Sequence, residues 1–469
     1  MKIVKYHFFI KHNFKINKIL MQAKKYQSLI IFFILLNYFL VFIKTCQAEE
    51  IKLISDTETE TFLQELVAPF LKLAELKESK IFLVQDDSVN AFVDENYHIF
   101  IHTGLLTKFN KVEVLLGVLA HEIGHIAGKH MVKSSVYQQN SQSKVLFGYA
   151  MAISALLAKS PDTATALALA TNDGIYKMQL KYSRQQEDSA DLMAIEFLEA
   201  LNYPVVGLQE IFRFFLQQSS AENTFDKYSR DQQEYLQTHP LSEKRLARIL
   251  QYQQKNHINW QKIKQLNDKL WLIQAKLDGF LLPTEVVLKK YSDDQQTTHQ
   301  IAQAIAYFRL NQYQKSLKTL DKAIKNNTKN GFLYELKAEL LQKSNQTELA
   351  IVNYQKAIAM LNLQQSGLAR LILAEMILNN LNNYANLIDF IEQKLLEAKI
   401  YLEDKPLFFK QMANIYHFKK QNSYANFYLG KYYFLLKNPQ KAKELWQEAL
   451  KTQPKLNEAL KLEVLELVD

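Results

Sequence analysis

The chain has 469 residues, 48% of them hydrophobic and 22% charged, and its formal net charge is +9. This length exceeds what one hydrophobic core usually supports, so we expect two folded domains in addition to any targeting segment. Residues 1–48 hold eight lysines and no acidic residue, so they carry nearly all of the excess positive charge. The composition therefore argues against nucleic-acid binding, which needs Lys and Arg clustered on a folded face.

The first 48 residues have the pattern of an export signal. Two lysines precede an apolar run over residues 29–43, and Cys46-Gln47-Ala48 offers a small-x-small cleavage site. The run is short for a bilayer span, which needs about 20 apolar residues. We predict a signal peptide over residues 1–48, with Met21 as a possible true start. An uncleaved anchor is the alternative, since a tilted helix or thinned bilayer tolerates some mismatch.

Residues 49–260 are predicted to form one mainly helical α+β domain with a small sheet. Apolar residues at helical spacing predict helices over residues 49–80, 111–131 and 183–200. Short apolar runs predict strands over residues 81–84, 91–93 and 99–101. The apolar stretch over residues 147–170 is interrupted by Lys159-Ser160-Pro161-Asp162, so we expect a buried or interfacial helical hairpin there rather than a membrane span.

Residues 261–469 are predicted to form an all-α domain, a helical linker followed by tetratricopeptide-like repeats. Lys-Ala-Ile at residues 322–324 recurs at 356–358, a shift of 34 residues, which is the tetratricopeptide period. The last copy has all the small, aromatic and proline positions of that repeat, at Gly430, Tyr433, Ala442, Trp446, Ala449 and Pro454. Residues 359–425 are helical but out of register. A generic helical bundle is the alternative.

The sequence His121-Glu122-Ile123-Gly124-His125 lies in the predicted helix over residues 111–131. Residues four apart lie on one helical face about one turn apart, so His121 and His125 can bind the same Zn²⁺. Glu122 lies beside them, where its carboxylate can take a proton from metal-bound water. A chance HExxH sequence is the alternative, so the prediction depends on a further ligand.

A zinc enzyme needs a third protein ligand and an open fourth position. The metzincin arrangement would place a histidine where Met131 stands, and His130 faces the opposite side of the helix. The gluzincin arrangement takes a glutamate from a later helix, and Glu187 fits it. Asp191 follows on the same helical face, where it can orient a ligand histidine. A solvated acidic helix face is the alternative for this pair.

Several motifs together resemble the HtpX/BepA metalloendopeptidase family. They are Asn90-Ala91-Phe92, Thr103-Gly104-Leu105-Leu106, the HExxH helix, Ser183-Arg184 to Asp191, and Thr238-His239-Pro240 with Arg245. Asp94-Glu95-Asn96 departs from the glycine-rich turn of the relatives, which puts the shape of that hairpin in doubt. With the export signal and the repeats, the resemblance implies a periplasmic protease, possessing a chaperone role, that acts on misassembled outer-membrane proteins. It also implies contact with their assembly machinery through the repeats.

The predicted reaction is peptide-bond hydrolysis with one Zn²⁺ per chain. Glu122 would deprotonate water beside the polarised carbonyl and later protonate the leaving amine. The strand containing Asn90, Ala91, Phe92 and Val93 could bind an extended, unfolded substrate by β-augmentation. One alternative is a non-catalytic chaperone or adaptor, against which the intact Glu122 argues. The other is a membrane-anchored processing protease that keeps its apolar N-terminal segment.

His239 has two interpretations. It can be a helix-capping or core histidine. Alternatively, its imidazole can take the open zinc position, displace the catalytic water and hold the enzyme inactive. Swung aside, it could hydrogen-bond the oxyanion, with Arg245 assisting electrostatically or fixing the loop. We predict that His239 is a reversible fourth ligand.

Overall fold

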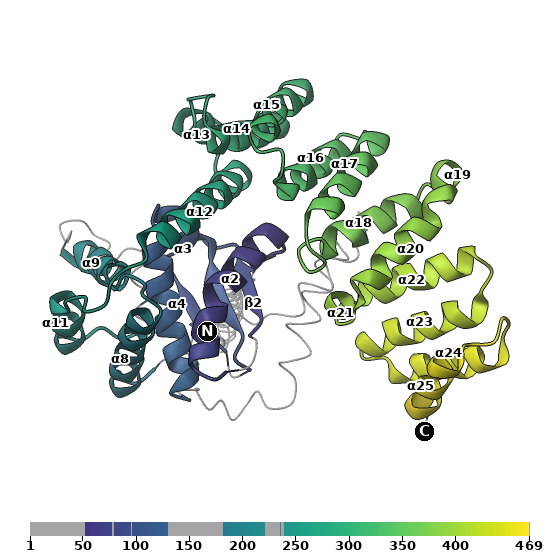
Figure 1. The fold of residues 1–469 in the computed structure, drawn as a ribbon, viewed down its shortest axis with the longest axis horizontal. Coiled ribbons are helices and arrows are strands. Elements are labelled where there is room, and N and C mark those ends of the chain that lie inside the picture. The colour runs from purple at the N-terminus through teal and green to yellow at the C-terminus, as the bar shows by residue number, and fades with distance from the viewer. Residues whose placement is uncertain are drawn as a thin grey trace, which may run out of the picture. The chain divides into compact units, whose positions relative to one another are not determined.

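The computed structural model describes residues 52–76, 79–94, 96–129, 182–220, 235 and 239–468 (Figure 1). The predicted signal peptide over residues 1–48 and the predicted hairpin over residues 147–170 lie outside these ranges. Among the described helices, none combines the length and the apolar character needed to cross a bilayer.

The first part of the described chain has the predicted α+β composition. Its strands are β1 (Leu53–Ile54), β2 (Ile81–Val84), β3 (Ala91–Val93) and β4 (Ile99–His102). Its helices are α2 (Thr57–Leu73), α3 (Thr103–Lys108), α4 (Val112–Ala127), α8 (Arg184–Ala200), α9 (Val206–Ser220) and α11 (Glu243–Gln251). The three predicted strands are present, and a helix lies within each predicted helical range. The helix predicted over residues 49–80 spans only Thr57–Leu73, because Leu53–Ile54 pair with β2 as strand β1. The sequence pattern does not predict β1, because two residues are too few to show a strand period.

The described strands form one sheet in the order β1-β2-β4-β3, so β3 lies at its end. Strands β2 and β4 are parallel, and the other two pairs are antiparallel. One face of the sheet packs into the core that also contains α2 and α4. The other face carries the stacked rings of Phe82, Phe100 and Phe92, whose neighbouring centroids are 5.1 and 4.9 Å apart. Because both faces of the sheet are buried, each of these strands appears in the sequence as a continuous apolar run instead of an alternating one.

Helix α4 is the central element of this core. All of its residues from Val112 to Ile126 are buried, and it packs against α2, α8 and α9. A helix that is apolar on all sides belongs in the interior of a domain. The polar residues that α4 carries are therefore held among fixed neighbours.

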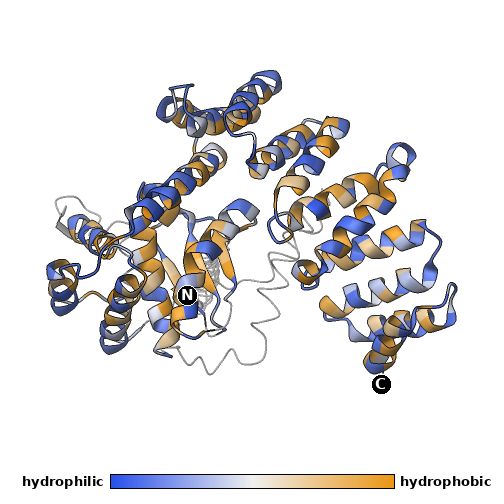
Figure 2. Cartoon of the chain, viewed as in Figure 1, coloured by the Kyte–Doolittle hydropathy of each residue, from blue (hydrophilic) through white to orange (hydrophobic). Residues whose placement is uncertain are grey.

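The remaining described elements are helices, and most of them pack against their neighbours in the chain. They are α12 (Trp260–Leu281), α13 (Thr284–Lys290), α14 (Thr297–Arg309), α15 (Tyr313–Asn326), α16 (Gly331–Lys343), α17 (Thr347–Met360), α18 (Gly367–Leu378), α19 (Leu381–Tyr384), α20 (Ile388–Glu397), α21 (Lys399–Leu402), α22 (Pro406–Phe418), α23 (Asn422–Leu435), α24 (Pro439–Lys451) and α25 (Glu458–Val468). Figure 2 shows hydrophobic and hydrophilic residues mixed along each of these helices, as stacked amphipathic hairpins require.

The 34-residue period corresponds to repeated packing positions. Ala323 in α15 and Ala357 in α17, 34 residues apart, are both fully buried. The out-of-register segment contains short helical pieces, α19 and α21, with a 3₁₀ turn at Ala385–Leu387. Such short pieces interrupt the regular alternation of two long helices, which explains why the sequence period weakens there.

Gly430 and Trp446 show why the last repeat needs a small residue opposite an aromatic one. The Trp446 ring is buried, and its Nε1–H donates to the carbonyl oxygen of Phe427 at 3.2 Å. A Cβ atom at position 430 would lie 2.2 Å from Trp446 Nε1. Helices α23 and α24 can therefore pack as closely as they do only because residue 430 has no side chain.

We predict that Gly430→Ala lowers the free energy of unfolding by about 1–3 kcal/mol, because the buried indole must move to admit the methyl group. Urea unfolding followed by circular dichroism measures this change. Gly367→Ala is the matched control, since its Cβ would meet only the flexible Leu402 side chain, at 3.1 Å. Equal stability of the two variants would contradict the packing argument.

Candidate metal centre

Helix α4 brings two histidines to one point in the interior. The Nε2 atoms of His121 and His125 are 3.1 Å apart, and both side chains are buried. Their rings meet edge to face, with centroids 4.7 Å apart. The two histidines thus lie on one face of α4, as predicted, and their Nε2 atoms are close enough to bind one metal ion.

Helix α8 supplies Glu187 to the same point. Glu187 Oε2 lies 3.5 Å from His121 Nε2, and Oε1 lies 3.3 Å from His125 Nε2. The start of α8 is fixed by a capping box, in which Ser183 and Gln186 each bond the other's backbone N–H. Glu187 follows in the first helical turn, so this cap also determines where its carboxylate lies.

Gly124 allows the two helices to approach this closely. A Cβ atom at position 124 would lie 2.8 Å from the carbonyl oxygen of Ala190 in α8. Backbone cannot give way as a flexible side chain can, so a larger residue would push α8 away from α4. The glycine within the HExxH sequence is therefore needed for Glu187 to reach the histidines.

These three side chains fit a tetrahedral metal ion. Four ligands at about 2.0–2.1 Å from Zn²⁺ are separated from one another by about 3.3 Å. The two imidazole Nε2 atoms are 3.1 Å apart, and each lies at a similar distance from one Glu187 oxygen, His121 3.5 Å from Oε2 and His125 3.3 Å from Oε1. Two imidazole nitrogens and a carboxylate oxygen are also the donors that zinc prefers. The donor set and its spacing thus suit a zinc ion.

The charged neighbours give the two histidines opposite properties. Burial alone would lower the pKa of His121, but hydrogen bonds to Asp191 and Glu187 raise it to about 10. Burial dominates at His125 and lowers its pKa to about 3. Burial would raise the pKa of Glu187, but the three imidazoles around it hold that pKa well below its ordinary range. A metal ion therefore meets an ionised carboxylate and must displace one proton, from His121.

Glu122 lies in the same interior, next to His121. Its side chain is buried, and its Oε2 atom has no hydrogen-bond partner among the described residues. Burial raises the pKa of Glu122 to about 6, although His239 and His121 oppose the change. A carboxylate with this pKa and one unpaired oxygen can exchange a proton with a water molecule near neutral pH.

Asp191 and Arg245 form a buried support for these ligands. Asp191 Oδ1 lies 3.0 Å from His121 Nδ1, which leaves Nε2 of that ring to face the centre. Arg245 donates to both Asp191 oxygens, at 2.6 and 2.9 Å, and to the carbonyl oxygen of Pro240 at 2.8 Å. Its Nη1 also lies 2.5 Å from Glu187 Oε2. These contacts support the loop-fixing interpretation of Arg245 over direct assistance to an oxyanion.

His239 lies within this group although it comes from a different part of the chain. Together with His121, His125 and Glu187 it offers ligand atoms that all lie within 4.8 Å of one another. His239 Nδ1 is 3.1 Å from Glu187 Oε1, and Nε2 is 3.5 Å from Glu122 Oε1. The geometry thus places His239 beside both the ligands and the candidate base.

Comparison with known proteins agrees with this geometry. Residues 57–253 match Peptidase family M48, and residues 423–456 match the tetratricopeptide repeat. The first part of the chain is an M48 peptidase domain. The candidate ligands on α4 and α8, together with His239, all fall inside the M48 match.

Relatives with curated names extend the similarity. The beta-barrel assembly-enhancing protease of Escherichia coli (strain K12) is 25% identical over 280 residues, 58% of this chain and 55% of its own. A putative protease of the same name from Vibrio cholerae is 28% identical over 35% of this chain and 33% of its own. A protease HtpX homolog from Methylacidiphilum infernorum is 34% identical over 19% and 31%. This chain therefore spans about half the length of the first relative and about a third of the length of the other two.

The solved structure of YrrB, described as a TPR protein with an unusual peptide-binding site, covers 42% of this chain and 91% of its own. It is 19% identical, and the TM-score is 0.27. A score of this size supports no conclusion about this chain.

The predicted substrate strand divides into two kinds of residue. On either side of β3, the Asn90 carbonyl accepts from His102 N–H and Asp94 N–H donates to the His98 carbonyl. In this register the backbone of Phe92, midway between them, also faces β4. Ala91 and Val93 occupy the other positions, whose backbone groups point away from β4. Of the four predicted residues, Ala91 and Val93 can therefore pair with an added strand, whereas the backbones of Asn90 and Phe92 face the sheet.

Tyr182 belongs to the centre, although the sequence gives it no role. It directly precedes the cap of α8, and its ring stacks on His125 with a centroid distance of 3.7 Å and an interplanar angle of 13°. Burial raises the pKa of Tyr182 well above its ordinary value, so the hydroxyl stays protonated. An aromatic residue next to a predicted helix cap is too common a pattern to reveal this position.

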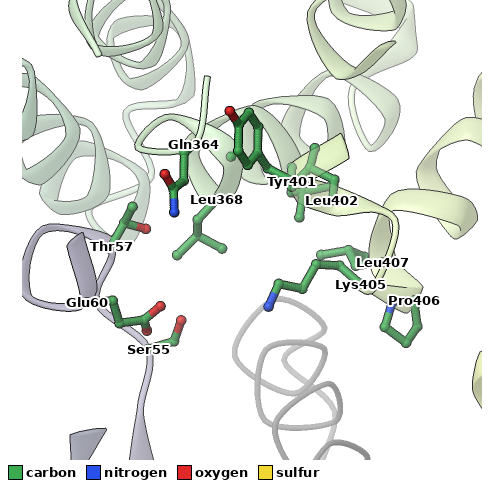
Figure 3. Close-up of a pocket in the computed structure, with 12 residues that line it drawn as sticks. Ser55, Thr57, Glu60, Gln364, Leu368, Tyr401, Leu402, Lys405, Pro406 and Leu407 are labelled. Atoms are coloured by element: carbon green, nitrogen blue, oxygen red, sulfur yellow. The ribbon is translucent and has the colours of Figure 1, made fainter. Parts of the chain in front are cut away.

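A separate pocket lies away from these ligands (Figure 3). It has a volume of about 210 Å³, and its lining includes Glu60, Leu368, Tyr401 and Lys405. None of the metal-centre residues lines it. We therefore assign the chemistry to the histidine cluster of the M48 domain.

We predict that Arg245→Lys weakens Zn²⁺ binding about 10- to 100-fold, because one ammonium group cannot bond both Asp191 oxygens and the Pro240 carbonyl together. Competition with a chromophoric chelator measures the affinity, and circular dichroism checks folding. Arg248→Lys is the control, since that neighbour in α11 has its hydrogen bond and its ion pair with Asp188. Equal Zn²⁺ affinity of the two variants would contradict the supporting role.

Proposed function

We propose that this protein is a zinc-dependent endopeptidase. The observation that carries the proposal is the convergence of His121, His125 and Glu187 in the interior, with Glu122 beside them. The match of this region to the M48 peptidase family supports the same chemistry. The fit of the ligand separations to a tetrahedral ion supports zinc as the metal.

The chain's own residues supply the proton transfers. Bound Zn²⁺ would act as a Lewis acid and lower the pKa of a water molecule. Glu122 accepts the proton of that water and then passes it to the amine of the leaving peptide. Its pKa of about 6 allows both steps near neutral pH. Asp191 and Arg245 hold His121 and Glu187 in place while this occurs.

The substrate class we propose is an extended segment of unfolded polypeptide. Strand β3 lies at the end of the described sheet and contacts His239 at Ala91, and the same imidazole lies 3.5 Å from Glu122 Oε1. An added strand gains affinity from main-chain hydrogen bonds at Ala91 and Val93 and does not depend on one side-chain sequence. A native domain cannot present such a segment, whereas an unfolded or misassembled protein can.

For the biological role, we propose quality control of outer-membrane β-barrel proteins in the bacterial periplasm. The names of the relatives and the export-signal pattern of residues 1–48 support this role. The repeats would bind client segments or parts of the assembly machinery, because stacked helical hairpins present a continuous surface. A chaperone activity would follow from such binding without cleavage.

The decisive test of the enzyme is Glu122→Gln. We expect this variant to retain one bound Zn²⁺ and to lose casein hydrolysis by about 10²–10⁴-fold, because only the proton-transfer role is removed. Zinc content is measured by mass spectrometry of the metal, and hydrolysis by release of labelled fragments. Glu113→Gln is the control on the same helix, since Glu113 bonds Asn267 rather than the centre. Hydrolysis by Glu122→Gln at the wild-type rate would exclude the assigned mechanism.

We also propose that His239 restrains the enzyme as a reversible fourth ligand. Its imidazole lies among the metal ligands, and its backbone is fixed by hydrogen bonding of His239 N–H to Tyr235 and by Arg245 at Pro240. In this position the ring would take the place that the catalytic water needs. Only the fraction of molecules with His239 displaced would then be active.

His239→Ala should therefore raise basal proteolysis roughly threefold or more, including self-cleavage, while zinc content stays at one ion per chain. Casein hydrolysis and the appearance of autolytic fragments measure the effect. His257→Ala is the control because this histidine is exposed. Unchanged hydrolysis, or a metal-bound structure with the His239 imidazole beyond coordination distance, would leave only the three-ligand site.

A further inference from the structure

The acceptors that a substrate strand needs at β3 are both contacted by side chains of the protein itself. The Tyr182 hydroxyl donates to the Val93 carbonyl oxygen at 3.4 Å. His239 Nε2 lies 3.3 Å from the Ala91 carbonyl oxygen. Ala91 and Val93 are the two residues of β3 whose backbone points away from β4. The two contacts therefore fall where β-augmentation would place substrate N–H groups.

Tyr182 is held at this place by rigid neighbours. Tyr182 is 2% exposed, and its ring stacks on His125 and makes a tilted contact with His239 at 5.4 Å. Its backbone is fixed by the adjacent capping box of α8. The ring is thus anchored by a candidate metal ligand, while the hydroxyl reaches the strand. The 3.4 Å bond is long for an O–H donor, so a substrate N–H can compete with it.

We propose that Tyr182 is a positioning residue that sets the affinity for extended substrates, because its hydroxyl occupies the Val93 acceptor until a substrate N–H replaces it. The inference rests on the proposed endopeptidase function and adds the residue that the substrate must displace. A substrate with a free backbone N–H at the paired position breaks the hydrogen bond between Tyr182 and Val93 and forms its own hydrogen bond to the Val93 carbonyl. Segments that lack this N–H, such as those with proline there, leave Val93 with Tyr182 and bind less well.

The test uses Tyr182→Phe, which keeps the ring on His125 and removes only the hydroxyl. In zinc-loaded protein with an unstructured fluorogenic peptide, we expect KM to fall about fivefold and kcat to change less than twofold, since one neutral hydrogen bond no longer opposes binding. Tyr203→Phe is the control, because Tyr203 is equally buried but packs against Phe70. A KM that stays constant or rises would overturn the proposal, as would a large loss of kcat at unchanged zinc content.

A binding measurement separates this inference from the proposed function. In the Glu122→Gln background, fluorescence anisotropy of a labelled extended peptide should show about fivefold tighter binding after Tyr182→Phe is added. If wild-type protein hydrolyses nothing but the peptide binds with this difference, the endopeptidase proposal fails and the role of Tyr182 stands. If hydrolysis is normal and the two affinities are equal, the role of Tyr182 fails alone.

Discussion

The ion pair between Arg245 and Asp191 is the interaction on which the centre depends. Arg245 carries one positive charge into an interior that also holds Asp191 and Glu187, and all three side chains are fully buried. Buried charges are tolerated only when they are paired and hydrogen-bonded with good geometry. The guanidinium meets this condition by donating to both oxygens of Asp191 on α8 and to the Pro240 carbonyl in the loop before α11, and by its ion pair with Glu187. The same ion pair orients His121, because Asp191 also contacts the Nδ1 atom of that ring. The interaction that balances the buried charges therefore also fixes the orientation of a metal ligand.

Close packing transmits this constraint to the reacting groups. Helix α4 is buried throughout, and Gly124 leaves no space for any side chain between it and α8. The carboxylate of Glu187 therefore cannot retreat from the histidines without opening the core. A ligand set held in this way is preorganised, so binding a metal ion requires little rearrangement of the protein. Burial of Glu122 also raises its pKa to about 6, which is suitable for proton exchange.

Local patterns are sufficient to predict part of this site. The spacing of His121 and His125 on one helical face, and the placement of Glu187 on a later helix, follow from helix geometry and zinc chemistry. The positions of the three strands follow from their apolar runs. The contacts of Arg245 with Asp191, and of Tyr182 with His125, could not be predicted, because they join residues distant in sequence and their patterns are common in proteins. The weak register after residue 359 likewise reflects short helical pieces that only the three-dimensional packing reveals.

Two side chains, His239 and Tyr182, each contact both strand β3 and the metal centre. His239 contacts the Ala91 carbonyl with one ring nitrogen and lies beside Glu187 with the other, so a substrate strand that takes Ala91 must move the same imidazole that approaches the ligands. Tyr182 similarly joins Val93 to His125. Coupling between two binding events is reciprocal, so a state in which His239 coordinates the metal must bind extended segments more weakly. Under the proposed restraint by His239, an unfolded segment would be both the substrate and the agent that releases the enzyme, and a folded protein would be neither.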